Sequence, residues 1–384
     1  MEFKVLILLL FTIILSLLNY YQKKFKFCLD HATTEEKHKK LLSLNNQTPL
    51  SGTIYFFIIT SILFYEDESY LLIPCIFFFG IGFFADLKIL KSPKLRLILQ
   101  FLILLIFFSI FHEIKIDLRI DLLNKLMQKN IFNVLIVSFF LLVLVNGYNF
   151  IDGVNNLSSL NFLIILTFIY LLCESINIYY LRNSILVCML AMVIFVIFNF
   201  FGKNLLGDGA TYGLSFFIGY ILIRISFFDD SISPYFIANL LWYPAFENLF
   251  TILRRSFNKD KNYLPDNKHL HQMIFKFIIK KKIFKQKFLC SSIAGISINI
   301  FLLILYIIGF LMNDYFRKLF LAKSEVVNAF LVDFLTIGSQ LILLFVLWYN
   351  SESEFSTVVF YIGFSYLPGL IYSLFVVGYK MPDL

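Results

Sequence analysis

Residues 131–157 read IFNVLIVSFFLLVLVNGYNFIDGVNNL, an apolar run that ends in a cluster of amides around one carboxylate. A helix needs roughly 20 predominantly apolar residues to cross a bilayer. Comparable runs lie near 3–21, 53–65, 70–85, 97–111, 131–147, 157–174, 184–201, 210–228, 233–250, 288–311, 327–349 and 355–379. We therefore expect an all-α, polytopic integral membrane helix bundle with about 10–12 transmembrane helices. It should form one membrane domain over residues 1–384, in which 288–384 supply the C-terminal transmembrane helices.

The composition leads to the same fold class. Of the 384 residues, 59% are hydrophobic and 15% are charged, whereas a soluble domain carries roughly 25% charged residues. So many apolar side chains cannot be hidden in one soluble core. This excludes a soluble globular enzyme, a disordered chain and a disulfide scaffold. The five cysteines form no CxxC pair, so we interpret them as small buried hydrophobic residues and expect no zinc site.

The basic residues predict the orientation of the chain. If the N-terminus is outside, the inward loops hold 22 of the 33 Lys and Arg residues, the bias typical of cytoplasmic loops. This bias accounts for the formal charge of +8, so nucleic acid is not expected as a partner. The first apolar run is followed by no small-residue cleavage site and is predicted to stay as an uncleaved helix. Residues 273–287, MIFKFIIKKKIFKQK, have a basic amphipathic pattern suited to the inner interface.

The first polar cluster lies in Gly80–Arg96, GIGFFADLKILKSPKLR, where Asp86 ends an apolar run. A single Asp at a helix end is often only a capping or solvated residue. Here Lys94 and Arg96 follow within ten residues. A carboxylate surrounded by cations at a membrane surface suits an anionic lipid head group.

The second cluster is Asn146–Leu157, in which Asn149, Asp152 and Asn155 gather at the end of an apolar run. Polar groups so close to hydrocarbon are costly and tend to face a cavity. A plain turn is the alternative for any single Asn, but the density of the cluster favours a binding site.

The third cluster is residues 204–213, NLLGDGATYG, in which Asp208 stands between two glycines. Asp-Gly is a common turn pair, so an ordinary turn is one interpretation. The other is a ligand for a hard metal ion, with glycines that let a phosphate come close. Mg²⁺ typically takes one or two carboxylates together with substrate phosphates and water.

The fourth cluster is residues 263–272, YLPDNKHLHQ, which contain His269 and His271 and follow Arg254 and Arg255. Imidazole and guanidinium groups suit a diphosphate at the membrane face. A solvated loop is the alternative, because an HxH pattern alone is weak.

In this order, the four segments resemble the polyprenyl-phosphate N-acetylhexosamine-1-phosphate transferases, which form glycosyltransferase family 4, over about residues 37–275. The matching runs are Ala85-Asp86 before Ser92–Leu97, then Asn146–Leu157, Gly207–Gly209 and Pro265–Gln272. The histidine run ends at Gln272, which favours the O-antigen-initiating type over the lipid I-forming type.

The resemblance implies a multi-pass enzyme of the bacterial inner (plasma) membrane, with its active site facing the cytoplasm. Such an enzyme transfers N-acetylhexosamine-1-phosphate from a UDP-N-acetylhexosamine to undecaprenyl phosphate and releases UMP. The implied cofactor is Mg²⁺, with Mn²⁺ as an alternative ion. The implied partners are the two substrates, the lipid bilayer and a second copy of the chain in a homodimer.

The resemblance also implies roles for residues. Asp208 would be the metal ligand, and Asp86 would orient or deprotonate the lipid phosphate. His269 and His271 would face the diphosphate. The implied nucleotide-pocket positions are Asp152 and Asn155, with Asn199 as a weaker nucleoside contact.

Two other functions are compatible with the sequence. A transporter or lipid flippase would suit the number of helices, although transporters place polar groups near the bilayer midplane. An inactive transferase homologue is suggested by Ala85, which stands where the family has the first acid of a pair.

Overall fold

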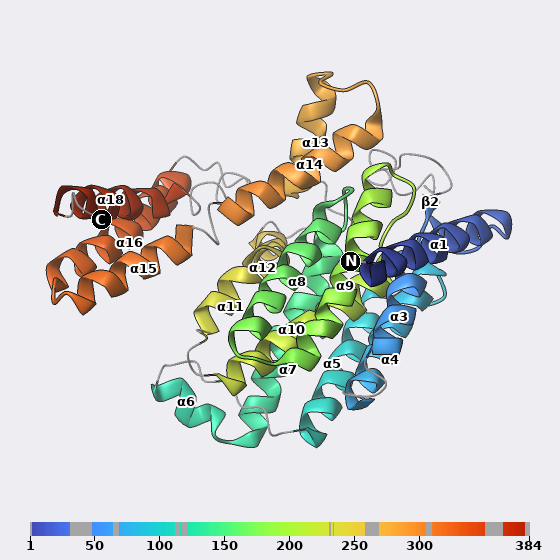
Figure 1. Cartoon of the computed structure of the whole chain (residues 1–384), viewed down its shortest axis with the longest axis horizontal. Coiled ribbons are helices and arrows are strands. Elements are labelled where there is room, and N and C mark those ends of the chain that lie inside the picture. Colours follow the sequence, from blue (N-terminus) through green and yellow to red (C-terminus); the bar gives the residue numbers. More distant parts are fainter. Residues whose placement is uncertain are drawn as a thin grey trace. The chain divides into compact units, whose positions relative to one another are not determined.

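The computed structural model describes residues 2–30, 48–63, 69–111, 116, 121–229, 232, 234–257, 269–304, 309–349 and 364–380. Nearly all regular structure in these ranges is helical (Figure 1). The described strands, β1 (Leu29–Asp30) and β2 (Thr48–Pro49), form one short antiparallel pair.

Seven of the described helices are long and apolar enough to cross a membrane. They are α1 (Glu2–Lys24), α5 (Pro93–Ile110), α7 (Asn130–Ile151), α8 (Leu157–Ser175), α9 (Tyr179–Phe200), α10 (Gly207–Phe228) and α14 (Lys287–Phe301). Four further apolar helices accompany them: α3 (Gly52–Leu63), α4 (Ser69–Asp86), α16 (Val326–Tyr349) and α18 (Tyr366–Lys380). The prediction of an all-α, multi-pass membrane protein is therefore confirmed.

One predicted apolar run forms two helices. Residues 233–250 were expected to form a single span, but the structure has α11 (Pro234–Leu240) and α12 (Trp242–Phe257), separated at Leu241. Pro244 lies in the first turn of α12, where its missing N–H costs nothing, whereas inside a continuous helix it would remove a hydrogen bond. The break before Pro244 follows from this preference.

The contacts divide the chain into two compact units. The first comprises residues 1–265 and 275–296, and the second comprises 266–274 and 297–384. In the second unit, α15 (Gly309–Ala322) packs with α16 and α18 around Phe316, Phe320 and Val332. The single-domain organisation stays a prediction.

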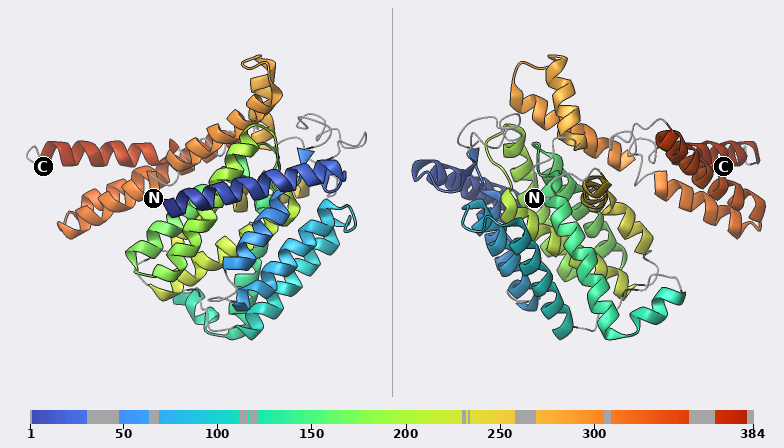
Figure 2. Two further views of the ribbon diagram at one scale, coloured as in Figure 1. Left: turned by 45° about the vertical axis from the view of Figure 1, so that its right-hand side comes forward. Right: turned by 180° about the vertical axis from the view of Figure 1, so that it is seen from behind.

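Helix α10 is the central helix of the first unit, where it packs against α3, α4, α7 and α8 (Figure 2). Within its candidate span 72% of the residues are buried, against 17% for α1. Glycines bring α4 and α10 into backbone contact, since a Cβ on Gly82 would lie 2.3 Å from Cα of Gly209. This close approach places the C-terminal end of α4 beside the N-terminal end of α10.

Candidate active site

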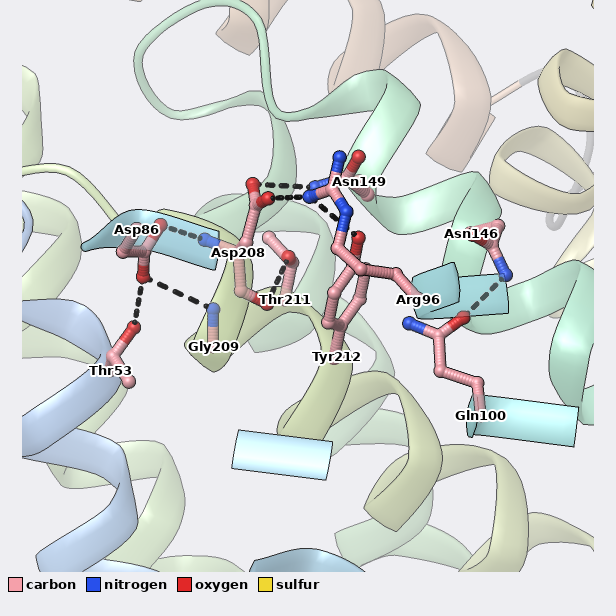
Figure 3. A network of polar contacts seen from close by, with 10 residues as sticks. All are labelled: Thr53, Asp86, Arg96, Gln100, Asn146, Asn149, Asp208, Gly209, Thr211 and Tyr212. Atoms are coloured by element: carbon pink, nitrogen blue, oxygen red, sulfur yellow. Dashed lines mark hydrogen bonds and ion pairs between the residues drawn. The ribbon is translucent and has the colours of Figure 1, made fainter. Parts of the chain in front are cut away.

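The ends of four helices bring four of the predicted residues together (Figure 3). Asp86 is the last residue of α4, Arg96 lies in the first turn of α5, Asn149 lies near the end of α7, and Asp208 lies in the first turn of α10. Ser92 fixes the start of α5, because its Oγ accepts a hydrogen bond from Leu95 N at 3.3 Å and Pro93 follows it.

Asp86 closes the N-terminal end of α10. Its Oδ1 accepts a hydrogen bond from Asp208 N at 2.8 Å, and its Oδ2 accepts one from Gly209 N at 3.3 Å. The N-cap residue of α10, Leu206, has no side-chain capping bond. The carboxylate of a neighbouring helix therefore satisfies backbone donors that would otherwise lack a partner, and its charge opposes the positive end of the helix dipole.

Thr53 completes this arrangement and was not among the residues predicted from the sequence. Its Oγ1 donates to Asp86 Oδ2 at 3.0 Å and accepts from Ala210 N at 3.1 Å. Thr53 is buried and lies at the start of α3. The sequence TPLSG at residues 48–52, directly before it, is the signal that could have drawn attention to it.

Gly207 is a further close neighbour of Asp86. Its backbone has a φ of +81°, in the left-handed region that favours glycine. A Cβ at this position would also lie 2.7 Å from Asp86 Oδ2. Both conditions select glycine immediately before Asp208.

Asp208 has a different set of partners. Its Oδ2 forms an ion pair with Arg96 Nη1 at 2.5 Å, and its Oδ1 accepts a hydrogen bond from Asn149 Nδ2 at 2.7 Å. The side chain of Asp208 remains 30% exposed, and that of Arg96 19% exposed. Arg96 Nη1 also lies 3.5 Å from Tyr212 Oη, so α5 is joined to α10 at two side chains.

The turn after α7 supplies the other predicted pocket residues. Asp152 is half-buried, and burial, followed by the charge of Asp208, raises its pKa to about 7. Asn155 is buried and its backbone N–H bonds to Ser291 Oγ at 2.9 Å. The Nδ2 atom of Asn155 is buried and has no hydrogen-bond partner in the described part of the chain.

The side chain of Asn199 links the start of α8 to the loop that precedes α10. Its Oδ1 accepts from Asn156 N at 2.6 Å and Ser159 Oγ at 3.2 Å, while its Nδ2 donates to Asn204 O at 2.7 Å. Its hydrogen-bonding capacity is therefore used largely within the protein. The nucleoside contact stays a prediction.

The remaining predicted basic residues lie in α5 and α12. Lys94 lies exposed in the first turn of α5. Arg254 and Arg255 lie in α12, and their side chains fall outside the described structure, as does the loop 258–268.

The two predicted histidines belong to the second unit. His269 and His271 are buried, and their rings stack with centroids 5.5 Å apart. Burial and then the neighbouring His269 hold the pKa of His271 well below its usual range. Their contact with a diphosphate stays a prediction.

The carboxylate of Asp208 is the candidate ligand for the predicted Mg²⁺. Among the described residues, no group of three or more His, Cys, Asp or Glu side chains could hold a metal ion. Asp208 nevertheless offers a partly exposed carboxylate, and the pKa of Asp152 responds to its charge. This oxygen donor set fits an ion that completes its coordination with substrate phosphates and water.

Comparison with known proteins points to one family. Residues 69–226 match the family model described as Glycosyl transferase family 4. This segment runs from α4 almost to the end of α10, and it contains Asp86, Arg96, Asn149 and Asp208. No curated protein matches the chain. The part of the chain that builds the site is therefore similar to glycosyltransferase family 4, which supports a transferase.

Proposed function

We propose that this protein transfers N-acetylhexosamine-1-phosphate from a UDP-N-acetylhexosamine to undecaprenyl phosphate and releases UMP. The reaction would start the synthesis of an O-antigen or another cell-surface glycan at the cytoplasmic face of a bacterial inner membrane. The observation that carries the proposal is the cluster of Asp86, Arg96, Asn149 and Asp208 within the segment that matches glycosyltransferase family 4.

The chemistry is a displacement at phosphorus. An oxygen of the lipid phosphate attacks the phosphorus that carries the sugar, and the bond from that phosphorus to the bridging oxygen breaks. UMP leaves with the bridging oxygen, and the product is a lipid diphosphate sugar. The acceptor phosphate is already ionised near pH 7, so the reaction does not depend on a strong general base.

The residues of the site fit this reaction by charge. Both substrates are anionic, so a cationic group must offset the repulsion between their phosphates. The guanidinium of Arg96 has the planar geometry that binds phosphate oxygens in pairs. Mg²⁺, held by Asp208, would supply the further positive charge that stabilises the phosphoryl transition state.

Asp86 is proposed to act as a positioning residue. Its two oxygens accept hydrogen bonds from Asp208 N, Gly209 N and Thr53 Oγ1. These bonds fix the backbone from which the Asp208 side chain extends. The direct role of Asp86 toward the lipid phosphate is a second proposal, and a pH profile of the Asp86→Asn variant separates the two.

The test uses the purified full chain in detergent with Mg²⁺, undecaprenyl phosphate and a panel of UDP-sugars, followed by mass spectrometry of the lipid. We expect a lipid diphosphate N-acetylhexosamine and an equal amount of UMP. Asp208→Asn should fold normally and lose at least a hundredfold in turnover, on the scale of an essential electrostatic group. Wild-type turnover by a folded Asp208→Asn variant would refute the metal assignment.

Two outcomes would favour the other functions. Substrate-dependent transport in proteoliposomes without release of UMP would indicate a transporter or flippase. Binding of uridine nucleotide without turnover, with activity restored by Ala85→Asp, would indicate an inactive homologue.

A further inference from the structure

A second basic surface lies outside the candidate active site, at the turn between α13 (Leu270–Lys280) and α14. Residues 276–287 read KFIIKKKIFKQK, and no Asp or Glu occurs anywhere from 267 to 313. Its lysines are Lys276, Lys280, Lys281, Lys282, Lys285 and Lys287. We call these twelve residues the lysine turn.

The backbone holds these lysines outward. Two residues after the end of α13, Lys282 adopts the left-handed conformation, at a φ of 52°. The N–H of Lys282 bonds to Ile279 O at 3.0 Å, and the N–H of Ile283 bonds to Ile278 O at 3.4 Å, which is the Schellman pattern of helix termination. All residues from 281 to 287 are exposed. The positive charge is therefore concentrated on a defined turn.

The lysine turn also presents apolar side chains. Phe275 and Ile278 are buried on the inner face of α13, whereas Phe277 is 57% exposed and Ile283 is 52% exposed. Lys281 Nζ lies 6.0 Å from the centre of the Phe277 ring. Exposed aromatic and aliphatic groups interleaved with lysines are typical of a surface that enters the boundary between lipid head groups and acyl chains.

The lysine turn lies directly before a candidate membrane span, and this position indicates its binding partner. Lys287 is the first residue of α14, and a candidate membrane span runs from Lys287 to Ile304. Lysines at the end of a span lie at the depth of the lipid head groups, and clusters of four to eight such residues bind anionic lipids. We propose that the lysine turn is a binding site for anionic phospholipid head groups, with Phe277 and Ile283 inserted beside the lipid chains. The proposal does not rest on the proposed transferase activity.

The test is a lipid titration of the purified full chain in neutral detergent, read by native mass spectrometry. Phosphatidylglycerol should bind in several copies, and phosphatidylcholine at the same concentration should not. The variant Lys281→Gln/Lys282→Gln should bind phosphatidylglycerol about thirtyfold more weakly, on the scale of two lysines at an anionic surface. Lys281→Arg/Lys282→Arg should bind as the wild type does, because both charges are kept.

A matched control removes two exposed lysines elsewhere. Lys125→Gln/Lys129→Gln, at α6 (Asp121–Met127) and the start of α7, should leave phosphatidylglycerol binding within about twofold of the wild type. Equal losses in both Gln variants would show that only net charge matters and would overturn the proposal. Equal binding of the two lipids, or displacement by millimolar inorganic phosphate, would overturn it as well.

Discussion

Two glycines in α4 give opposite expectations that test how this helix positions the site. A Cβ on Gly82 would lie 2.3 Å from both Cα and N of Gly209, whereas a Cβ on Gly80 would meet nothing within 4 Å. Because the atoms opposite Gly82 are backbone, relief of the clash requires α4 to move away from α10. Ordinary van der Waals contact begins near 3.4 Å, so the required movement is about 1 Å.

The two alanine variants should change the free energy of unfolding in opposite directions. Gly82→Ala should lower the free energy of unfolding by about 1–3 kcal/mol through overpacking. Gly80→Ala should raise it by about 0.5–1 kcal/mol, because alanine costs less backbone entropy than glycine in a helix. Thermal unfolding of the two variants in the same detergent measures this difference.

The same movement of α4 should displace Asp86 in the candidate site. Asp86 ends α4, and its Oδ1 lies 2.8 Å from Asp208 N, so a shift of about 1 Å would break this hydrogen bond. We expect Gly82→Ala to lose on the order of a hundredfold in turnover, as a misplacement of this size can cost, while Gly80→Ala keeps its turnover. Equal stability and equal turnover of the two variants would refute the claim that backbone contact between α4 and α10 sets the site.

Three further predictions concern single side chains. Thr53→Val should lose about 2–4 kcal/mol of stability, because one bond to a carboxylate and one to a backbone N–H disappear, and Thr53→Ser should restore it; equal melting temperatures would contradict this. Arg96→Gln removes the cation that competes with Mg²⁺ for Asp208, so less Mg²⁺ should be needed to stabilise the protein. The Mg²⁺ concentration that gives half of the maximal rise in melting temperature should fall severalfold, and an unchanged concentration would count against this competition. Folding favours the protonated form of Asp152, whose pKa is raised from 3.8 to about 7, so stability should fall as the pH rises from about 4 to 7. In urea titrations the stability advantage of Asp152→Asn should grow by about 2–3 kcal/mol from pH 5 to pH 8, and a constant difference would exclude this linkage.

Local sequence patterns predicted those parts of the site that lie at helix ends. A carboxylate that ends an apolar run, as at Asp86, or stands between glycines, as at Asp208, is visible from its immediate neighbours. The pairing of Arg96 with Asp208 joins residues 112 positions apart. Both residues stand next to predicted apolar runs, but the sequence could not show which acid the guanidinium would meet.

The sequence could not reveal the residues whose roles depend on tertiary contacts alone. Thr53 bonds to Asp86 across 33 positions and to Ala210 across 157 positions. Residues 48–52 mark the start of this helix, but nothing in the sequence shows that Thr53 would meet Asp86 and Ala210. The difference between Gly80 and Gly82 is equally hidden, because only the crossing of α4 and α10 places backbone atoms opposite Gly82.

Asp86 and Asp208 have different surroundings, so an incoming cation or phosphate should displace the partners of only one of them. The oxygens of Asp86 bond to backbone N–H groups and to Thr53, and these donors cannot leave without disturbing the start of α10. The oxygens of Asp208 bond to Arg96 and Asn149, side chains on other helices that can turn away without breaking a helix. Two carboxylates with such different surroundings take different roles. A cation or phosphate that enters the site should therefore exchange with Arg96 at Asp208, while Asp86 keeps its bonds and holds the backbone in place.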